Sequence, residues 1–254
     1  MIKLLNVSKF YDKTEVVQGL SIEIEQGKIT ALVGENGAGK STVLSMMARF
    51  MKESSGEILF EGKPIRQIKD LEMAKRVAVL RQMNVTNVKL TIRELVELGR
   101  FPHSKGRLTK HDHAKVDEAL AFLTLHNIQH KYLDEISGGQ CQRAFIAMVV
   151  AQDTDYILLD EPLNNLDMRN SVNIMKILRK LCDGLGKTIV MVIHDINFAS
   201  AYADNMIAMK NGKLIKAGTV DELMTEECLH DIFGMKCNVQ DFAGDKVCVY
   251  YKSG

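Results

Sequence analysis

The chain has 254 residues, of which 46% are hydrophobic and 26% charged, as in a globular protein long enough to bury a core. Its formal net charge of +1 gives no reason to expect nucleic acid or an anionic membrane as the main partner. The five cysteines are scattered without a CxxC pair, which indicates reduced packing residues in a cytosolic protein and argues against a disulfide framework or a zinc site.

Short apolar runs alternate with helical patterns along the chain, which predicts an α/β fold. In chain order we expect a strand at 27–33, a helix from 39 to about 50 and a strand at 76–81. Amphipathic helices follow from about 88 to 136, with a polar loop at 101–112. After them we expect a strand at 155–160, a helix at 171–186 and a strand at 187–193. A hairpin turning at Asn211-Gly212 is expected over 206–218, and residues 244–254 alternate weakly, as an edge strand does. The layout predicts a core over residues 1–85 and 146–234, a helical subdomain over 86–145 and an extension over 235–254.

No segment has the pattern of a membrane span or a signal peptide. The N-terminus becomes polar too early for a signal peptide, and the longest apolar runs, such as 144–151, are far shorter than a bilayer requires. We therefore expect that any work at a membrane depends on docking to other chains.

A glycine-rich stretch lies between a predicted strand and a predicted helix. Residues 34–41 match G-x-x-x-x-G-K-[ST], a loop whose backbone N–H groups wrap a triphosphate while the helix N-terminus faces the same anion. A Cβ at one of the three glycines would obstruct that close approach. Lys40 supplies charge to the β and γ phosphates, Ser41 a hydroxyl to Mg²⁺, and Thr42 lies beside the same phosphates. The predicted ATP-binding residues here are Gly34, Glu35, Asn36, Gly37, Ala38, Gly39, Lys40, Ser41 and Thr42.

Three other predicted strands end in polar residues, at the sheet edge where ligands of parallel sheets bind. We expect Asp160 to hold Mg²⁺ through water and Glu161 to polarise the attacking water. His194 is expected to contact the γ phosphate, and Gln82 to contact Mg²⁺ and the water. Solvated acids and a structural histidine are the alternative interpretations, but four such strand ends together favour phosphoryl transfer.

Residues 137–140 predict a second anion site. Ser137, Gly138, Gly139 and Gln140 precede an apolar helix whose first N–H groups suit an anion, although an ordinary helix cap explains the same residues. A chain with one complete phosphate loop needs a second only for a neighbouring molecule's nucleotide. A two-fold dimer supplies that arrangement symmetrically.

The order of GENGAGKST, Gln82, ISGGQ, ILLDEP, NNLD and His194 resembles an ATP-binding cassette (ABC) ATPase over about residues 2–234. The resemblance implies a RecA-like P-loop core with an antiparallel β edge, an inserted helical subdomain, and two ATP molecules sandwiched in a head-to-tail dimer. By position, it implies that Tyr11 stacks on adenine and that Asp167 belongs to a loop that communicates across the dimer. It also implies that Gln82 links Mg²⁺ to the helical subdomain and the membrane partner.

Four residues depart from the family pattern without removing a phosphate or metal ligand. They are Ile136 for leucine, Cys141 for arginine or lysine, Leu163 for threonine or serine, and Asn164 for serine. These departures affect loop details, so hydrolysis is still expected.

LGRFPH at 98–103, together with 149–168 and HDINFA at 194–199, resembles the importer group for iron–siderophore, haem and cobalamin. The resemblance implies an ATPase at the cytoplasmic face of the cell membrane that drives iron–siderophore uptake. The implied partners are polytopic permease subunits and, indirectly, a substrate-binding protein. Nucleic acid is not expected as a partner. Haem or cobalamin import stays open. A soluble ABC ATPase in iron–sulfur cluster assembly would more commonly carry SGGE, and a non-catalytic regulator would usually lack Glu161, Lys40 or His194.

Four histidines and the last residues have no clear place in this scheme. His126 and His130 are four apart on an expected helix, a spacing that suits a metal, but no third ligand is in view and solvated histidines are the preferred interpretation. His111 and His113 fall in the expected polar loop. Residues 235–254 are interpreted as either a family extension or a dimer contact.

Overall fold

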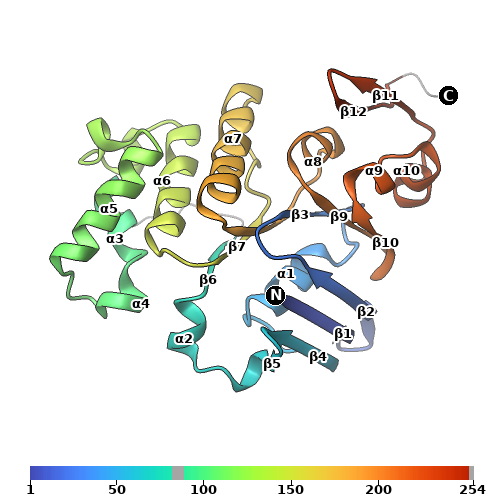
Figure 1. Cartoon of the computed structure of the whole chain (residues 1–254), viewed down its shortest axis with the longest axis horizontal. Helices are drawn as coiled ribbons and strands as arrows, with labels where there is room; N and C mark the ends of the chain where they lie inside the picture. Colours follow the sequence, from blue (N-terminus) through green and yellow to red (C-terminus); the bar gives the residue numbers. More distant parts are fainter. Residues whose placement is uncertain (82–88, 252–254) are drawn as a thin grey trace. The chain divides into compact units, whose positions relative to one another are not determined.

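The computed structural model describes residues 1–81 and 89–251, and the chain divides into two compact units. Unit 1 comprises residues 1–68 and 181–254, and unit 2 comprises residues 69–180. The predicted helical subdomain, residues 86–145, falls within the range of unit 2, while its boundaries stay a prediction. Figure 1 labels the helices and strands.

Unit 1 begins with an antiparallel sheet in the order β2-β1-β4-β5. β1 (Ile2–Tyr11) pairs with β2 (Thr14–Ile24) and with β4 (Ser55–Phe60). β4 also pairs with β5 (Lys63–Pro64), which is followed by a 3₁₀ turn at Ile65–Gln67. Ile2 and Leu4 of β1 are buried together with Ile58 and Phe60 of β4. Because successive side chains of a strand point to opposite faces, this alternation gives the sheet one apolar face.

The other strands of unit 1 surround β3 (Ile29–Val33). β3 is parallel to β8 (Thr188–Val192) and to β9 (Asn205–Lys210), and β10 (Lys213–Thr219) is antiparallel to β9. Every residue of β3 and β8 is buried, as expected for strands covered on both faces. Asn211 and Gly212 join β9 to β10 with φ angles of 49° and 79°, so the predicted hairpin turn is confirmed.

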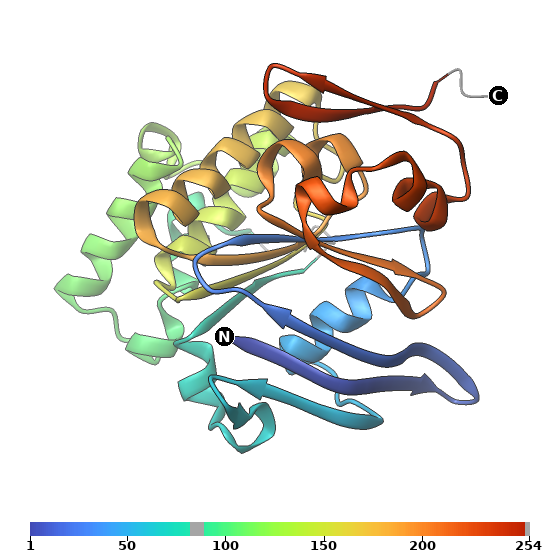
Figure 2. The same cartoon turned by 45° about the vertical axis from the view of Figure 1, so that its right-hand side comes forward.

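Helices cover these strands within unit 1. α1 (Lys40–Met47) packs against β2 and β8, and α8 (Ile196–Tyr202) packs against β3 (Figure 2). α9 (Val220–Leu223) and α10 (Glu226–Phe233) follow β10 and pack against β9 and β10. Buried Val43, Leu44, Met46 and Met47 form the inner side of α1.

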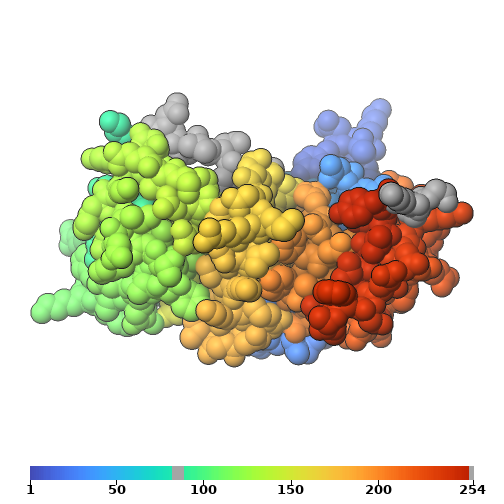
Figure 3. All heavy atoms as spheres, turned by 90° about the horizontal axis from the view of Figure 1, so that it is seen from above, coloured from blue at the N-terminus to red at the C-terminus, as the bar shows by residue number. Residues whose placement is uncertain are grey.

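The C-terminal residues form a hairpin of their own. β11 (Asn238–Phe242) and β12 (Asp245–Val249) pair with each other, so the edge strand expected over 244–254 instead belongs to a separate two-stranded sheet. The hairpin is fastened to α8, because the Asn197 side chain donates to the carbonyl of Cys248 at 3.2 Å and accepts from its N–H at 2.7 Å. Ser200 Oγ also donates to the carbonyl of Lys246 at 2.6 Å. Figure 3 shows the red C-terminal part of the chain beside the orange part that contains α8.

Unit 2 combines a parallel strand pair with helices. β6 (Val77–Leu80) pairs with β7 (Tyr156–Asp160). The helices are α2 (Asp70–Ala74), α3 (Ile92–Leu98), α4 (Phe101–Ser104), α5 (Lys110–Phe122), α6 (Gly138–Ala151) and α7 (Met168–Leu185), with 3₁₀ turns at His126–Ile128 and Leu133–Glu135. The last residues of α7 belong to unit 1. α3, α5 and α6 pack against one another.

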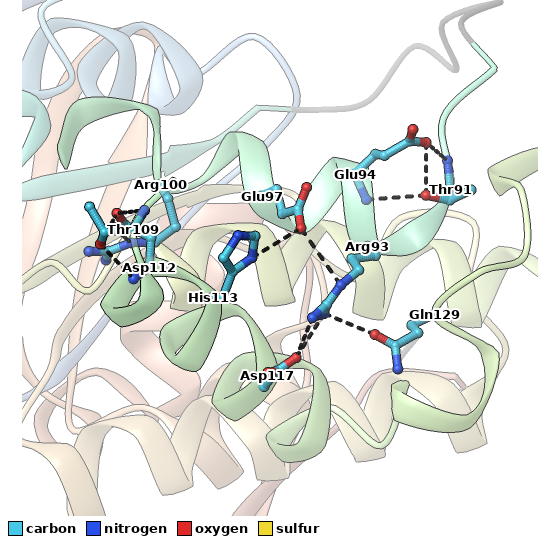
Figure 4. Close-up of polar contacts among 10 residues, drawn as sticks. All are labelled: Thr91, Arg93, Glu94, Glu97, Arg100, Thr109, Asp112, His113, Asp117 and Gln129. Carbon is cyan, nitrogen blue, oxygen red and sulfur yellow. Dashed lines mark hydrogen bonds and ion pairs between the residues drawn. The ribbon is translucent and has the colours of Figure 1, made fainter. Parts of the chain in front are cut away.

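A buried ion pair ties three of these helices together (Figure 4). Arg100, the residue directly before α4, donates through Nε to Asp112 Oδ1 at 2.9 Å and through Nη1 to the carbonyl of Ala151, at the end of α6, at 2.8 Å. The side chains of Arg100 and Asp112 are only 3% and 5% exposed. Arg100 of the LGRFPH segment therefore stabilises the helical packing of unit 2.

The expected polar loop at 101–112 is wrong at both ends. Residues 101–104 form α4, and α5 begins at Lys110, so His111 and His113 lie on a helix. The helix begins there because Thr109 and Asp112 form a capping box. Thr109 Oγ1 accepts a hydrogen bond from the N–H of Asp112, and Asp112 Oδ2 accepts one from the N–H of Thr109.

The helix expected to carry both His126 and His130 is also wrong. The 3₁₀ turn that contains His126 ends at Ile128, before His130. Thr124 has a φ of 55°, so the backbone after α5 is not helical at that residue. Within residues 1–81 and 89–251, no group of three or more histidine, cysteine or acidic side chains is placed to hold a metal ion. None of the described helices is long and apolar enough to cross a membrane.

Candidate functional site

The glycine-rich loop joins β3 to α1, as predicted. Gly39, with a φ of 95°, is the residue that caps α1, and it offers no side-chain acceptor to the first N–H groups of the helix. The N-terminus of a helix carries such N–H groups together with a partial positive charge, so this end of α1 suits an anion. The arrangement fits a phosphate group.

Two of the loop glycines are required by packing within unit 1. A Cβ on Gly34 would lie 2.0 Å from the carbonyl oxygen of Met209, and a Cβ on Gly39 would lie 2.6 Å from that of Val16. A Cβ on Gly37 would meet nothing within 4 Å, although its φ of 80° still favours glycine. Gly34 and Gly39 thus let the loop pack against β9 and β2, and this reason adds to the expected approach of phosphate.

Lys40 is the cation of this loop. Its side chain is buried, and Nζ donates to the carbonyl oxygens of Gly34 and Glu35, at 2.8 Å in each case. These bonds hold the ammonium group over the loop, where it can reach a phosphate bound by the same N–H groups. Ser41 and Thr42 follow in the first turn of α1 and are half-buried.

His194 and Tyr11 are the other predicted site residues in unit 1, and both are exposed. His194 follows β8, and the next residue, Asp195, caps α8 by accepting from the N–H groups of Asn197 at 2.8 Å and Phe198 at 3.1 Å. Asp195 therefore fixes the backbone beside His194. Tyr11 lies at the end of β1, where its hydroxyl donates to Met51 Sδ at 3.0 Å and Lys9 Nζ lies over its ring, 5.6 Å from the ring centroid.

Asp160 and Glu161 lie at the end of β7 in unit 2. Residues 156–159 are buried, while Asp160 and Glu161 are half-buried. Glu161 has a φ of 52°, a conformation that residues other than glycine adopt infrequently. Asn164 Nδ2 donates to Glu161 Oε2 at 3.3 Å, and Gln142 Nε2 of α6 donates to the carbonyl oxygen of Pro162 at 2.8 Å.

The predicted second anion site is the N-terminus of α6, also in unit 2. Ser137 Oγ accepts from the N–H of Gln140 at 3.3 Å, and Gln140 Oε1 accepts from the N–H of Ser137 at 3.0 Å, which forms a capping box. Ser137 and Gly138 are exposed, and Gly139 is buried. This helix end has the geometry of an ordinary cap, and of the four residues in the second-site prediction it exposes Ser137 and Gly138.

Asp167 is connected to this helix end through a residue that the sequence analysis missed. Asp167 accepts from the backbone N–H of Asn170 at 2.8 Å and from its side chain at 2.9 Å. A Cβ on Gly139 would lie 2.5 Å from Asn170 Cγ, so the glycine allows α6 to approach the Asp167 loop. The signal for Asn170 was its place three residues after an aspartate, where a helix cap is expected.

Electrostatics at the α6 terminus differ from the family pattern at Cys141. Burial raises the pKa of the Cys141 thiol, so the side chain is neutral at pH 7, where arginine or lysine would carry a charge.

The predicted site residues are divided between the two units. Lys40, Ser41 and His194 lie in unit 1, and Asp160, Glu161, Asp167 and 137–140 lie in unit 2. Gln82 lies outside the described residues.

Comparison with known proteins supports the family expectation. The model of the ABC transporter family matches residues 17–164, more than half of the chain. The petrobactin import ATP-binding protein YclP of Bacillus subtilis (strain 168) is 52% identical over 251 residues, which cover 99% of this chain and 100% of that protein.

Two solved structures agree in fold. A chain of a metal-chelate type ABC transporter in an inward-facing conformation aligns with a TM-score of 0.86 at 24% identity, covering 98% of this chain and 96% of that one. The dimeric structure of the bacterial ABC transporter cassette MJ0796 aligns with a TM-score of 0.76 at 30% identity, covering 87% of this chain and 99% of that one. The predicted cassette fold, with antiparallel and parallel sheets, is confirmed. The chain belongs to the ABC transporter family and is an ATPase subunit that binds ATP.

Proposed function

We propose that this chain hydrolyses MgATP as a homodimer and thereby drives import of an iron–siderophore complex of the petrobactin class through separate permease subunits at the cytoplasmic face of the membrane. The observation that carries the ATPase part is the loop at 34–41, where Lys40 Nζ is held over the backbone that precedes α1. The cargo is supported by YclP, which is named for petrobactin import and matches almost the whole chain. This likeness favours a siderophore over haem, cobalamin or a role in iron–sulfur cluster assembly.

In the proposed mechanism the phosphates lie against the N-terminus of α1, and Lys40 neutralises part of their charge. Ser41 and Asp160, with Gln82, would hold Mg²⁺, and their hydroxyl, carboxylate and amide oxygens fit the hard ligands that this ion prefers. When bound, Mg²⁺ supplies charge neutralisation at the β and γ phosphates. Tyr11 would stack on the adenine ring.

Glu161 acts as the base in this scheme. Its carboxylate accepts a proton from a water molecule whose oxygen attacks the γ phosphorus, while His194 orients the water. The bond from the γ phosphorus to the bridging oxygen breaks, its electron pair stays with ADP, and inorganic phosphate is released. Residues 137–140 of the partner subunit would complete the site by contacting the γ phosphate. The dimeric structure of the similar MJ0796 cassette supports the dimer that this arrangement needs. Asp167 would contact the partner subunit.

Glu161→Gln tests the enzymatic part of the proposal. A general base contributes roughly 100-fold or more to rate, so turnover is expected to fall by at least that factor while ATP still binds. Size-exclusion chromatography with MgATP should then show a persistent dimer. Glu118→Gln on α5, an exposed glutamate of the same unit, is the matched control and should keep full activity. Undiminished turnover in Glu161→Gln would remove Glu161 from the mechanism.

The cargo is tested in cells that lack their own siderophore-import ATPase. Expression of this chain together with its permease should restore uptake of radioactive iron supplied as ferric petrobactin. Lys40→Ala serves as the inactive control. Uptake restored for haem or cobalamin, and not for the siderophore, would contradict the proposed cargo.

A further inference from the structure

The loop that follows Glu161 is a compact pair of turns within unit 2. The N–H of Asn164 donates to the carbonyl of Glu161 at 3.2 Å, and the N–H of Leu166 donates to the carbonyl of Leu163 at 3.2 Å. Glu161 and Asn165 both have left-handed backbones, with φ angles of 52° and 60°. The backbone therefore turns sharply directly after the proposed base.

Both ends of this loop are fastened. Near its beginning, Gln142 of α6 donates to the carbonyl oxygen of Pro162 at 2.8 Å. At its end, Asp167 accepts from the backbone and the side chain of Asn170 in the first turn of α7. The backbone that carries Glu161 is thus well defined. The direction of the carboxylate itself still depends on the side-chain torsions of Glu161 and on what its oxygens contact.

We propose that Asn164 is a positioning residue that orients the Glu161 carboxylate for hydrolysis, an inference that rests on the proposed role of Glu161 as the base. The amide Nδ2 of Asn164 donates to Oε2 of Glu161 at 3.3 Å. A bond to one carboxylate oxygen limits rotation of the whole carboxylate group. Asn164 occupies the position where serine is common in the family, and the longer amide side chain allows the contact with Oε2.

The chemistry of the amide suits this task. An asparagine NH₂ group donates hydrogen bonds but does not take up a proton near neutral pH, so it does not compete with the base. The contact is long and exposed, and water replaces it in part when it is lost. The expected contribution is therefore modest, well below that of Glu161 itself.

The test compares Asn164→Leu, which removes the donor at similar size, with Asn164→Ser, which keeps a shorter donor. For Asn164→Leu, kcat should fall roughly fivefold while KM for ATP changes by less than about twofold. Asn164→Ser should lie between Asn164→Leu and wild type. Asn173→Leu, the same change at an exposed residue of α7, is the control and should keep wild-type kcat. Because ATP binding is not altered, the MgATP-dependent dimer of Asn164→Leu should still form on size exclusion.

The double variant Glu161→Gln/Asn164→Leu separates this inference from the proposed function. If Asn164 acts through Glu161, the second change should lower the residual turnover by less than about twofold. Wild-type kcat in Asn164→Leu, a parallel rise in KM, or loss of the ATP-dependent dimer would overturn the inference while leaving Glu161 as the base. Undiminished turnover in Glu161→Gln alone would overturn the proposed base and the inference together.

Discussion

The buried pair of Arg100 and Asp112 permits a quantitative test of what stabilises the helices of unit 2. Asp112→Ala removes a carboxylate that accepts from Thr109 N at 2.9 Å, Thr109 Oγ1 at 2.7 Å and Arg100 Nε at 2.9 Å. The substitution leaves the guanidinium, whose side chain is 3% exposed, with its bond to the carbonyl of Ala151 but without a counterion. Removing one partner of a buried pair costs about 3–5 kcal/mol, so we expect a loss of that size in the free energy of unfolding.

Urea-induced unfolding followed by far-UV circular dichroism measures this loss. The control is Asp117→Ala, on the same helix α5, because Asp117 pairs with Arg93 at 2.6 Å but its side chain is 49% exposed. An exposed pair contributes about 1 kcal/mol or less. If Asp112→Ala destabilises the protein no more than Asp117→Ala does, the burial and capping contacts of Asp112 do not contribute about 3–5 kcal/mol to the free energy of unfolding. Figure 4 shows both aspartates.

The pH dependence of the same difference provides a second check. Hydrogen bonds from Thr109, and then the interaction with Arg100, hold the pKa of Asp112 well below its usual range. A carboxyl group whose pKa is lower in the folded state adds stability above its unfolded pKa of about 3.9 and loses it as the pH falls toward the folded value. The gap in stability between wild type and Asp112→Ala should therefore be constant above about pH 5 and shrink below pH 4.

The remaining predictions concern unit 1. Gly34→Ala should lower ATP affinity at least roughly tenfold, because its Cβ would lie 2.0 Å from the Met209 carbonyl oxygen. Gly37→Ala has open space around its Cβ, so its expected cost is about 1–2 kcal/mol of backbone strain. Its ATP affinity should therefore fall less than that of Gly34→Ala. Titration with a fluorescent ATP analogue compares the two, and equal affinities would contradict the packing argument. Burial, followed by the contact with Cys237, raises the pKa of Cys248 to about 12. Alkylation of Cys248 at pH 8.5, followed by peptide mass spectrometry, should be at least about 100-fold slower in the native protein than in urea, and comparable rates would show that this thiol is not buried in the hairpin.

Local patterns in the sequence predicted much of the fold. The apolar runs at 29–33 and 188–192 are strands, and Asn211-Gly212 turns a hairpin, because these features depend on neighbouring residues. The family-level order of motifs predicted the cassette fold correctly. The polar appearance of residues 101–112 was misleading, since the capping box at Thr109 begins a helix despite that polarity.

The candidate site divides in the same way. The sequence by itself determined which residue types are present: a glycine-rich loop with Lys40, an acidic pair at the end of β7 and a serine before the helix that follows residue 137. Only the tertiary structure decided that Gly34 packs against Met209, that Asn170 connects Asp167 to Gly139, and that Arg100 pairs with Asp112. The physical reason is that these contacts join segments whose separation along the chain has no periodic pattern, so they exist only after the strands and helices have packed.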